Sequence, residues 1–227
     1  MALNPAEKDF AQKHYSFDEV VELSYATNAF DEFEDKYIYP CNSIYLGQLI
    51  RTDASIARQY QKAIDSLLPF SNNLIAKCRL AQLYAFRYEY YYYQQALEYA
   101  KEGAEAGLAE AQWTYGKFIF DENPKAYHDA LYWLRKASEQ GHKIATCQMG
   151  IIYENMYYDH DIGIQQSKEY LALARRYLCE AETHEGMYHL AKIAFIHDED
   201  AAYAKKLLET IVDRYPMANY GLGVLYQ

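Results

Sequence analysis

Residues 109–116 read Ala-Glu-Ala-Gln-Trp-Thr-Tyr-Gly, and residues 145–150 repeat the same order of small and large side chains as Ala-Thr-Cys-Gln-Met-Gly. In both stretches a large apolar residue lies four positions after an alanine, Tyr115 after Ala111 and Met149 after Ala145, and a glycine comes next. Such a recurring pattern indicates a repeat protein. Its copies begin at Asn42, Ala76, Ala111, Ala145, Gly186 and Ala218, which lie 34, 35, 34, 41 and 32 residues apart.

A second helical pattern lies between these anchors. Residues 96–103 read Ala-Leu-Glu-Tyr-Ala-Lys-Glu-Gly, and residues 130–137 read Ala-Leu-Tyr-Trp-Leu-Arg-Lys-Ala. Each is followed by a glycine, Gly107 or Gly141, which can take the left-handed conformation that ends a helix. One such hairpin cannot bury its apolar face alone, so hairpins stack. The sequence therefore predicts an all-α fold, an α/α solenoid of about five antiparallel helical hairpins plus a terminal helix over residues 37–227.

These residues resemble the Sel-one-like repeat family, a relative of the tetratricopeptide repeats. The resemblance is carried by residues 109–116, by Ala130 and Trp133, and by the run Lys-Ala-Ser-Glu-Gln-Gly-His at 136–142. It is closest over 73–155 and looser over 37–72 and 156–227. Glu182 and Arg214 depart from it, because they stand where a closing glycine is expected. The resemblance implies a superhelix that serves as a protein–protein interaction scaffold, and it implies no chemistry.

Residues 1–36 lie outside the repeats and are rich in acidic side chains. Ser16 to Glu19 form a capping-box pattern, which predicts a helix from about Phe17. We expect this segment to form an acidic helical cap on the solenoid. Residues 1–50 hold 9 acidic and 3 basic residues, and the whole chain has a formal charge of −10. This acidity argues against binding nucleic acid and would steer a basic protein partner.

The cysteines and the hydropathy pattern indicate a compartment. Cys41, Cys78, Cys147 and Cys179 include no CxxC pair, so the sequence favours a reduced chain without a zinc ribbon. No secretory signal is visible, and no window approaches the roughly 18 apolar residues that span a bilayer. We therefore expect a cytoplasmic protein with no membrane partner.

Helical geometry divides each anchor helix into a packed side and an opposite side, because successive residues turn by about 100°. A solvated face should be polar. The opposite side instead holds aromatic residues beside charged ones, which is the composition of interaction hot spots. We expect this concave face to bind a protein or peptide through Trp113, Lys117, Phe120, Ile151, Glu154, Tyr188, Lys192, Phe195 and Tyr220. The alternative is that the inner wall of a curved solenoid is crowded, so that these side chains pack on each other.

The sequence thus favours an adaptor that is not an enzyme and needs no cofactor. A sharper hypothesis is an inhibitor or immunity protein that neutralises a basic toxin, or a binder of a signalling protein. The alternative class is a metal-dependent hydrolase with a site near His184 or His160. His184 and His189 are five residues apart, whereas a zinc helix of the HExxH type needs four. The apolar residues of the last helix predict a monomer or a weak homodimer formed through that helix.

Overall fold

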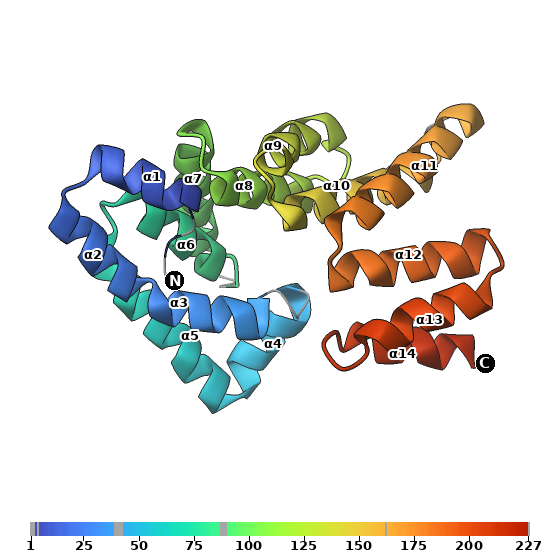
Figure 1. Ribbon diagram of the computed structural model, residues 1–227, viewed down its shortest axis with the longest axis horizontal. Helices are drawn as coiled ribbons and strands as arrows, with labels where there is room; N and C mark the ends of the chain where they lie inside the picture. Colours follow the sequence, from blue (N-terminus) through green and yellow to red (C-terminus); the bar gives the residue numbers. More distant parts are fainter. Residues whose placement is uncertain (1–2, 4, 39–42, 87–89, 162, 227) are drawn as a thin grey trace. The chain divides into compact units, whose positions relative to one another are not determined.

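A computed structural model describes Leu3 and residues 5–38, 43–86, 90–161 and 163–226, and all regular structure within these ranges is helical (Figure 1). Cys41 and Asn42 lie outside the described residues. The chain forms two compact units, residues 1–115 and 116–227. The elements are α1 (Pro5–His14), α2 (Phe17–Ala26), α3 (Asn28–Phe33), the π-helix η1 (Glu34–Ile38), α4 (Ser43–Thr52), α5 (Ala54–Leu67), the 3₁₀ turn η2 (Leu68–Phe70), α6 (Leu74–Tyr84), α7 (Tyr90–Glu105), α8 (Ala109–Glu122), α9 (Tyr127–Glu139), α10 (Lys143–Tyr157), α11 (Ile164–Ala181), α12 (His184–His197), α13 (Ala201–Ile211) and α14 (Met217–Leu225).

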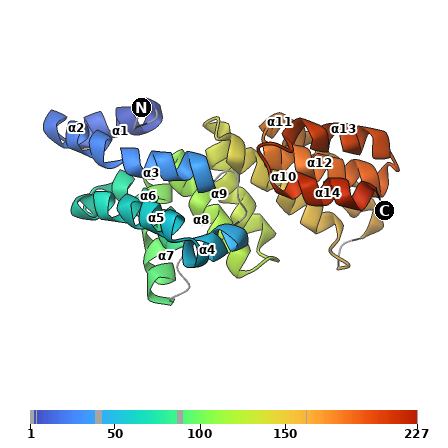
Figure 2. The same cartoon turned by 90° about the horizontal axis from the view of Figure 1, so that it is seen from below.

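The helices pair in the order that the two sequence patterns predict. The anchor pattern lies on α4, α6, α8, α10, α12 and α14, and the second pattern supplies the helices between them. In the first unit α4 packs on α5 and α6 on α7, and in the second unit α10 packs on α11, α12 on α13, and α13 on α14. Figure 2 shows α11 and α13 along one side of the second unit, with α10, α12 and α14 along the other. The predicted all-α solenoid of antiparallel hairpins is confirmed.

The hairpins close where the sequence predicts. Gly107 and Gly141 take the left-handed conformation, with φ of +91° and +85°. Glu182 occupies the same closing position and is also left-handed, with φ 51° and ψ 34°, although it carries a side chain. Arg214 does not follow this geometry, and the chain there turns through a hydrogen bond from the Tyr215 amide to the Ile211 carbonyl at 2.8 Å.

Small residues on the anchor helices let the second helix of each hairpin approach closely. A Cβ added at Gly150 of α10 would lie 2.7 Å from Cγ of Leu178 on α11. A Cβ at Gly116 of α8 would lie 3.0 Å from Cγ of Leu134 on α9. The distance at Gly150 is too short for two carbon atoms, and the one at Gly116 is tighter than an ordinary contact, so a side chain at either glycine would force the paired helix to shift.

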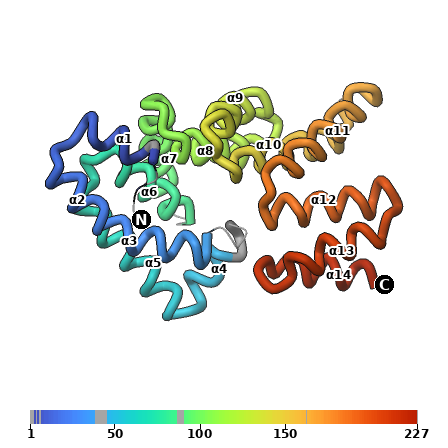
Figure 3. Tube along the Cα trace, viewed as in Figure 1, coloured from blue at the N-terminus to red at the C-terminus, as the bar shows by residue number. Residues whose placement is uncertain are grey.

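The amino-terminal helices belong to the same compact unit as α4 to α7, and the tube in Figure 3 follows them from α1 to α3. Ser16 caps α2 in the predicted capping box, with its side chain accepting from the Glu19 amide. α3 packs along α5, and Phe30 and Phe33 are fully buried. Arg79 of α6 lies 3.0 Å from Glu7 of α1, so an ion pair fastens this segment to the repeats.

The last helix is covered on one side. Leu222 and Leu225 pack against a buried cluster that includes Leu208, Ile211 and Ala218. Tyr220 and Tyr226 remain exposed. The two leucines of α14 are therefore half-buried within their own unit, while Tyr220 on the helix and Tyr226 just after it are exposed.

Candidate functional site

The residues that the sequence predicts to bind a partner all lie on anchor helices. Trp113 is in the first unit, and the other eight are in the second. Lys117 and Phe120 lie on α8, Ile151 and Glu154 on α10, Tyr188, Lys192 and Phe195 on α12, and Tyr220 on α14. On α8, Lys117 forms an ion pair with Asp121, and the Phe120 ring lies 6.4 Å from that of Tyr127.

Two of these residues do not face solvent as the helical geometry predicts. Trp113 exposes only 7% of its surface and Glu154 only 2%. Cys78 and Cys147, at the same repeat position as Trp113, are also buried. At the two cysteines a glycine of a neighbouring helix comes close: a Cβ at Gly103 would lie 2.3 Å from Sγ of Cys78, and one at Gly186 would lie 3.6 Å from Sγ of Cys147. The predicted exposure of Trp113 and Glu154 is therefore wrong.

Glu154 is the centre of a charged cluster that joins α10 to α12. His189 Nδ1 lies 2.5 Å from Oε2 of Glu154, and Lys192 Nζ lies 2.9 Å from Oε1. Burial by itself would raise the pKa of Glu154, but the hydrogen bond and charge of His189, together with Lys192, outweigh burial and lower this pKa. The carboxylate is therefore ionised at neutral pH, and it holds two basic side chains of α12 against α10.

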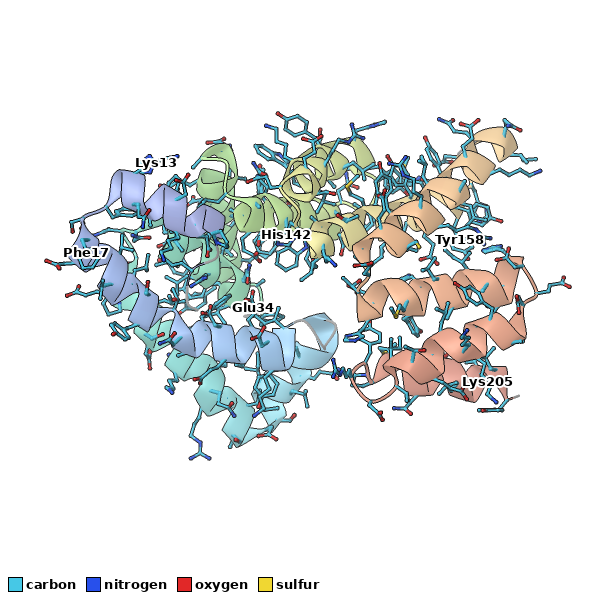
Figure 4. The ribbon with its side chains drawn as sticks, viewed as in Figure 1. Lys13, Phe17, Glu34, His142, Tyr158 and Lys205 are labelled. Carbon is cyan, nitrogen blue, oxygen red and sulfur yellow. The ribbon has the colours of Figure 1, made fainter. Side chains whose placement is uncertain are left out.

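Aromatic side chains surround the outer end of this cluster. Lys192 Nζ lies 5.5 Å from the ring centroid of Tyr158, which Figure 4 labels beside α12. The Tyr158 hydroxyl lies 2.8 Å from Nε2 of His197, and the Tyr157 hydroxyl lies 3.4 Å from Nδ1 of the same ring. Burial and the nearby Arg175 guanidinium lower the pKa of His197, so its ring is neutral at neutral pH.

The same surface continues from α12 to α14. The centroid of the Tyr188 ring lies 5.7 Å from that of the Tyr215 ring. A Cβ added at Gly221 of α14 would lie 3.4 Å from Cε2 of Tyr188. Burial raises the pKa of Tyr188, and the nearby Tyr220 and Glu154 side chains raise it further. We define the tyrosine–lysine face by half-buried or exposed side chains of α10, of its C-cap residue, of α12 and of α14: Ile151, Tyr158, Tyr188, Lys192, Phe195 and Tyr220.

This face combines hydrophobic area with few free charges. Phe195 exposes 38% and Tyr220 68% of their surface. Lys192 is already paired with Glu154, so the buried carboxylate neutralises the charge of the lysine. Tyrosine and phenylalanine rings with polar tips are enriched in protein interfaces. The arrangement can therefore contact another protein.

Sequence reasoning missed Tyr158, His189 and His197. Tyr158 and His197 lie beyond the anchor positions, near the carboxyl ends of α10 and α12. His189 stands next to Tyr188 and turns toward Glu154 of the neighbouring repeat. The sequence did contain a signal for the contact between α10 and α12. Glu154 and His189 are an acidic residue and a histidine that lie one repeat period apart.

The predicted alternative sites lie apart from this cluster. His184 is exposed at the first residue of α12, whereas His189 engages Glu154. His160 is exposed in a turn in which Asp159 accepts a hydrogen bond from the Tyr127 hydroxyl at 3.0 Å. Within the part of the chain that the structure describes, no three His, Cys, Asp or Glu side chains gather as metal ligands would.

No helix among the described residues has the length and apolar character needed to cross a bilayer. The fold and the site together define an α-helical hairpin solenoid with an aromatic face on its second unit. Comparison of the chain with protein-family models, with curated proteins and with solved structures found no match.

Proposed function

We propose that this chain is a protein-interaction scaffold whose second unit binds a partner protein or peptide on the tyrosine–lysine face. The observation that carries the proposal is the exposure of Phe195, three residues after a lysine on α12 that a buried glutamate already neutralises, and of Tyr220 on α14. Exposed aromatic groups in a cluster mark interaction sites. The hairpin architecture also supports the Sel-one-like resemblance, whose members are interaction scaffolds.

The charge distribution supports a basic partner. Residues 1–50 hold most of the net negative charge of the chain, with 9 acidic and 3 basic side chains. An acidic surface attracts a basic protein and raises its association rate. An inhibitor or immunity protein that neutralises a basic toxin fits this chemistry. Cys78, Cys147 and Cys179 are free thiols, which fits a reducing compartment such as the cytoplasm.

Site-specific photocrosslinking tests the location of the proposed contact. A photoreactive phenylalanine analogue placed at Tyr220 should capture the partner in the native host, and mass spectrometry of the product identifies it. Tyr203 on α13 supplies the matched control, because it is an exposed tyrosine of the same unit on the opposite layer of helices. Capture from position 203 and none from position 220 would place the contact on the other layer and refute the proposal.

A further inference from the structure

The first unit carries a groove that has no role in the proposed function. It is an open depression of about 560 Å³ between α1 and α2, the two helices that meet at the left of Figure 1. Its wall is mainly apolar and includes Tyr15, Phe17, Val20, Val21 and Tyr25, with Lys8 on the α1 side.

α2 has two apolar stripes, although only one is used for folding. Leu23 and Ala26 point into the core of the first unit and are buried. Phe17, Val21 and Tyr25 are spaced four residues apart and therefore form a second stripe along the helix. Phe17, labelled at the start of α2 in Figure 4, exposes 81% of its surface, and Tyr25 exposes 73%. Two large side chains this exposed on one stripe mark an interaction surface.

An acidic strip runs beside this second stripe. Asp18 and Glu22 each follow a stripe residue directly and are four residues apart, so both lie along the same edge of α2. Both are exposed. Other acidic groups of the segment already have partners: Glu7 and Asp31 lie beside Arg79, and Asp9 is paired with Lys13.

We propose that this groove binds an amphipathic helix of a partner protein, with its apolar side against Phe17, Val21 and Tyr25 and its lysines or arginines against Asp18 and Glu22. A helix laid in an apolar groove is a common mode of peptide recognition. Lys8 on the opposite wall fixes the orientation, because it repels a basic side chain and leaves only the α2 edge favourable.

The charge of the segment argues against two other occupants. Residues 1–50 hold 9 acidic and 3 basic residues, so a second copy of this chain would bring two acidic surfaces together. A membrane rich in anionic lipids would be repelled for the same reason. A basic protein segment is the occupant that this surface favours.

Two synthetic helical peptides test the proposal on the full chain. Both carry leucine and phenylalanine at helical spacing, and they differ only in flanking residues, lysine in one and glutamate in the other. Fluorescence anisotropy should show saturable binding of the lysine peptide and binding of the glutamate peptide that is weaker by about tenfold or more. No saturable binding of either peptide, or equal affinity for both, would overturn the proposal.

Variants locate the binding on the groove and check its orientation. Phe17→Ser should lower the affinity for the lysine peptide by about tenfold. Tyr132→Ser alters an exposed tyrosine of α9 and should leave this affinity unchanged. Asp18→Asn with Glu22→Gln should weaken binding by about fivefold and flatten its salt dependence, and Lys8→Gln should strengthen it. Sedimentation of the wild-type chain and of Phe17→Ser tests whether a second copy of the chain occupies the groove. A wild-type dimer that Phe17→Ser abolishes would overturn the proposal. Binding of the wild-type chain to phosphatidylserine vesicles that Phe17→Ser abolishes would overturn it as well.

Discussion

Glu7 and Arg79 stand 72 residues apart in sequence and form a buried ion pair, with 3.0 Å between Oε2 and Nη2. This contact, with Asp31 at 3.5 Å from the same guanidinium, ties the amino-terminal helices to α6. The segment is therefore an integral part of the first unit.

Breaking this pair should destabilise the chain strongly. Glu7→Gln leaves the buried Arg79 guanidinium without the closer of its two carboxylates, and we expect a loss of about 3 kcal/mol in the free energy of unfolding. Asp9→Asn removes an exposed carboxylate that pairs with Lys13 and should cost less than about 1 kcal/mol. Urea unfolding of both variants measures the difference. Equal stability of the two would show that the buried pair does not hold the segment.

Acid should weaken the link between α10 and α12. The pKa of Glu154 lies below its ordinary value of 4.5, so the folded chain favours the ionised carboxylate. Its stabilisation is therefore complete above pH 4.5 and is lost as the pH falls through the lowered value. At pH 7, Glu154→Gln should be less stable than wild type by about 2 kcal/mol, and the gap should narrow in acid. Glu209→Gln on α13, an exposed carboxylate, is the control. A gap that stays constant down to pH 3 would contradict the assignment.

Trp113 and Tyr220 occupy the same repeat position and should behave differently on truncation. Trp113 is buried and Tyr220 is exposed. Trp113→Ala should lower the free energy of unfolding by about 3–5 kcal/mol, whereas Tyr220→Ala should change it by about 0.5 kcal/mol or less. Thermal unfolding monitored by circular dichroism measures both. A Trp113→Ala variant as stable as wild type would mean that its side chain is solvated.

Because the backbone of Glu182 is left-handed, glycine should be a more stable replacement than alanine at this position. Both Glu182→Gly and Glu182→Ala remove the ion pair with Lys143, whose Nζ lies 2.6 Å from Oε2. Only glycine relieves the strain of a positive φ, so the glycine variant should be more stable than the alanine variant by about 1 kcal/mol. The reverse order would mean that α11 does not close as the repeats at Gly107 and Gly141 do.

The helices could be predicted because their signals are local. The anchor pattern, the capping box at Ser16 and the closing glycines Gly107 and Gly141 each lie within a few residues of the element that they specify. The left-handed closure at Glu182 could not be predicted from residue type, because glutamate has no preference for that conformation. The repeat spacing gave its position, and the packing of α11 and α12 imposes its geometry.

The site was harder to predict because it depends on contacts between helices. Helical geometry puts Glu154 on the side opposite the packed one, but α12 covers it with His189 and Lys192. The face assignment succeeded for Phe195 and Tyr220, which are exposed. The groove beside Phe17 depends on the angle between α1 and α2, and no sequence pattern encodes that angle.

The most direct test of the account is the affinity of the chain for its crosslinked partner, measured by titration calorimetry with three proteins: wild type, Phe195→Ala and Tyr203→Ala. Both residues are exposed aromatics of the second unit, on α12 and α13. The account predicts that Phe195→Ala weakens binding by about tenfold or more at unchanged melting temperature, while Tyr203→Ala binds as wild type does. Unchanged binding by Phe195→Ala together with weakened binding by Tyr203→Ala would contradict it.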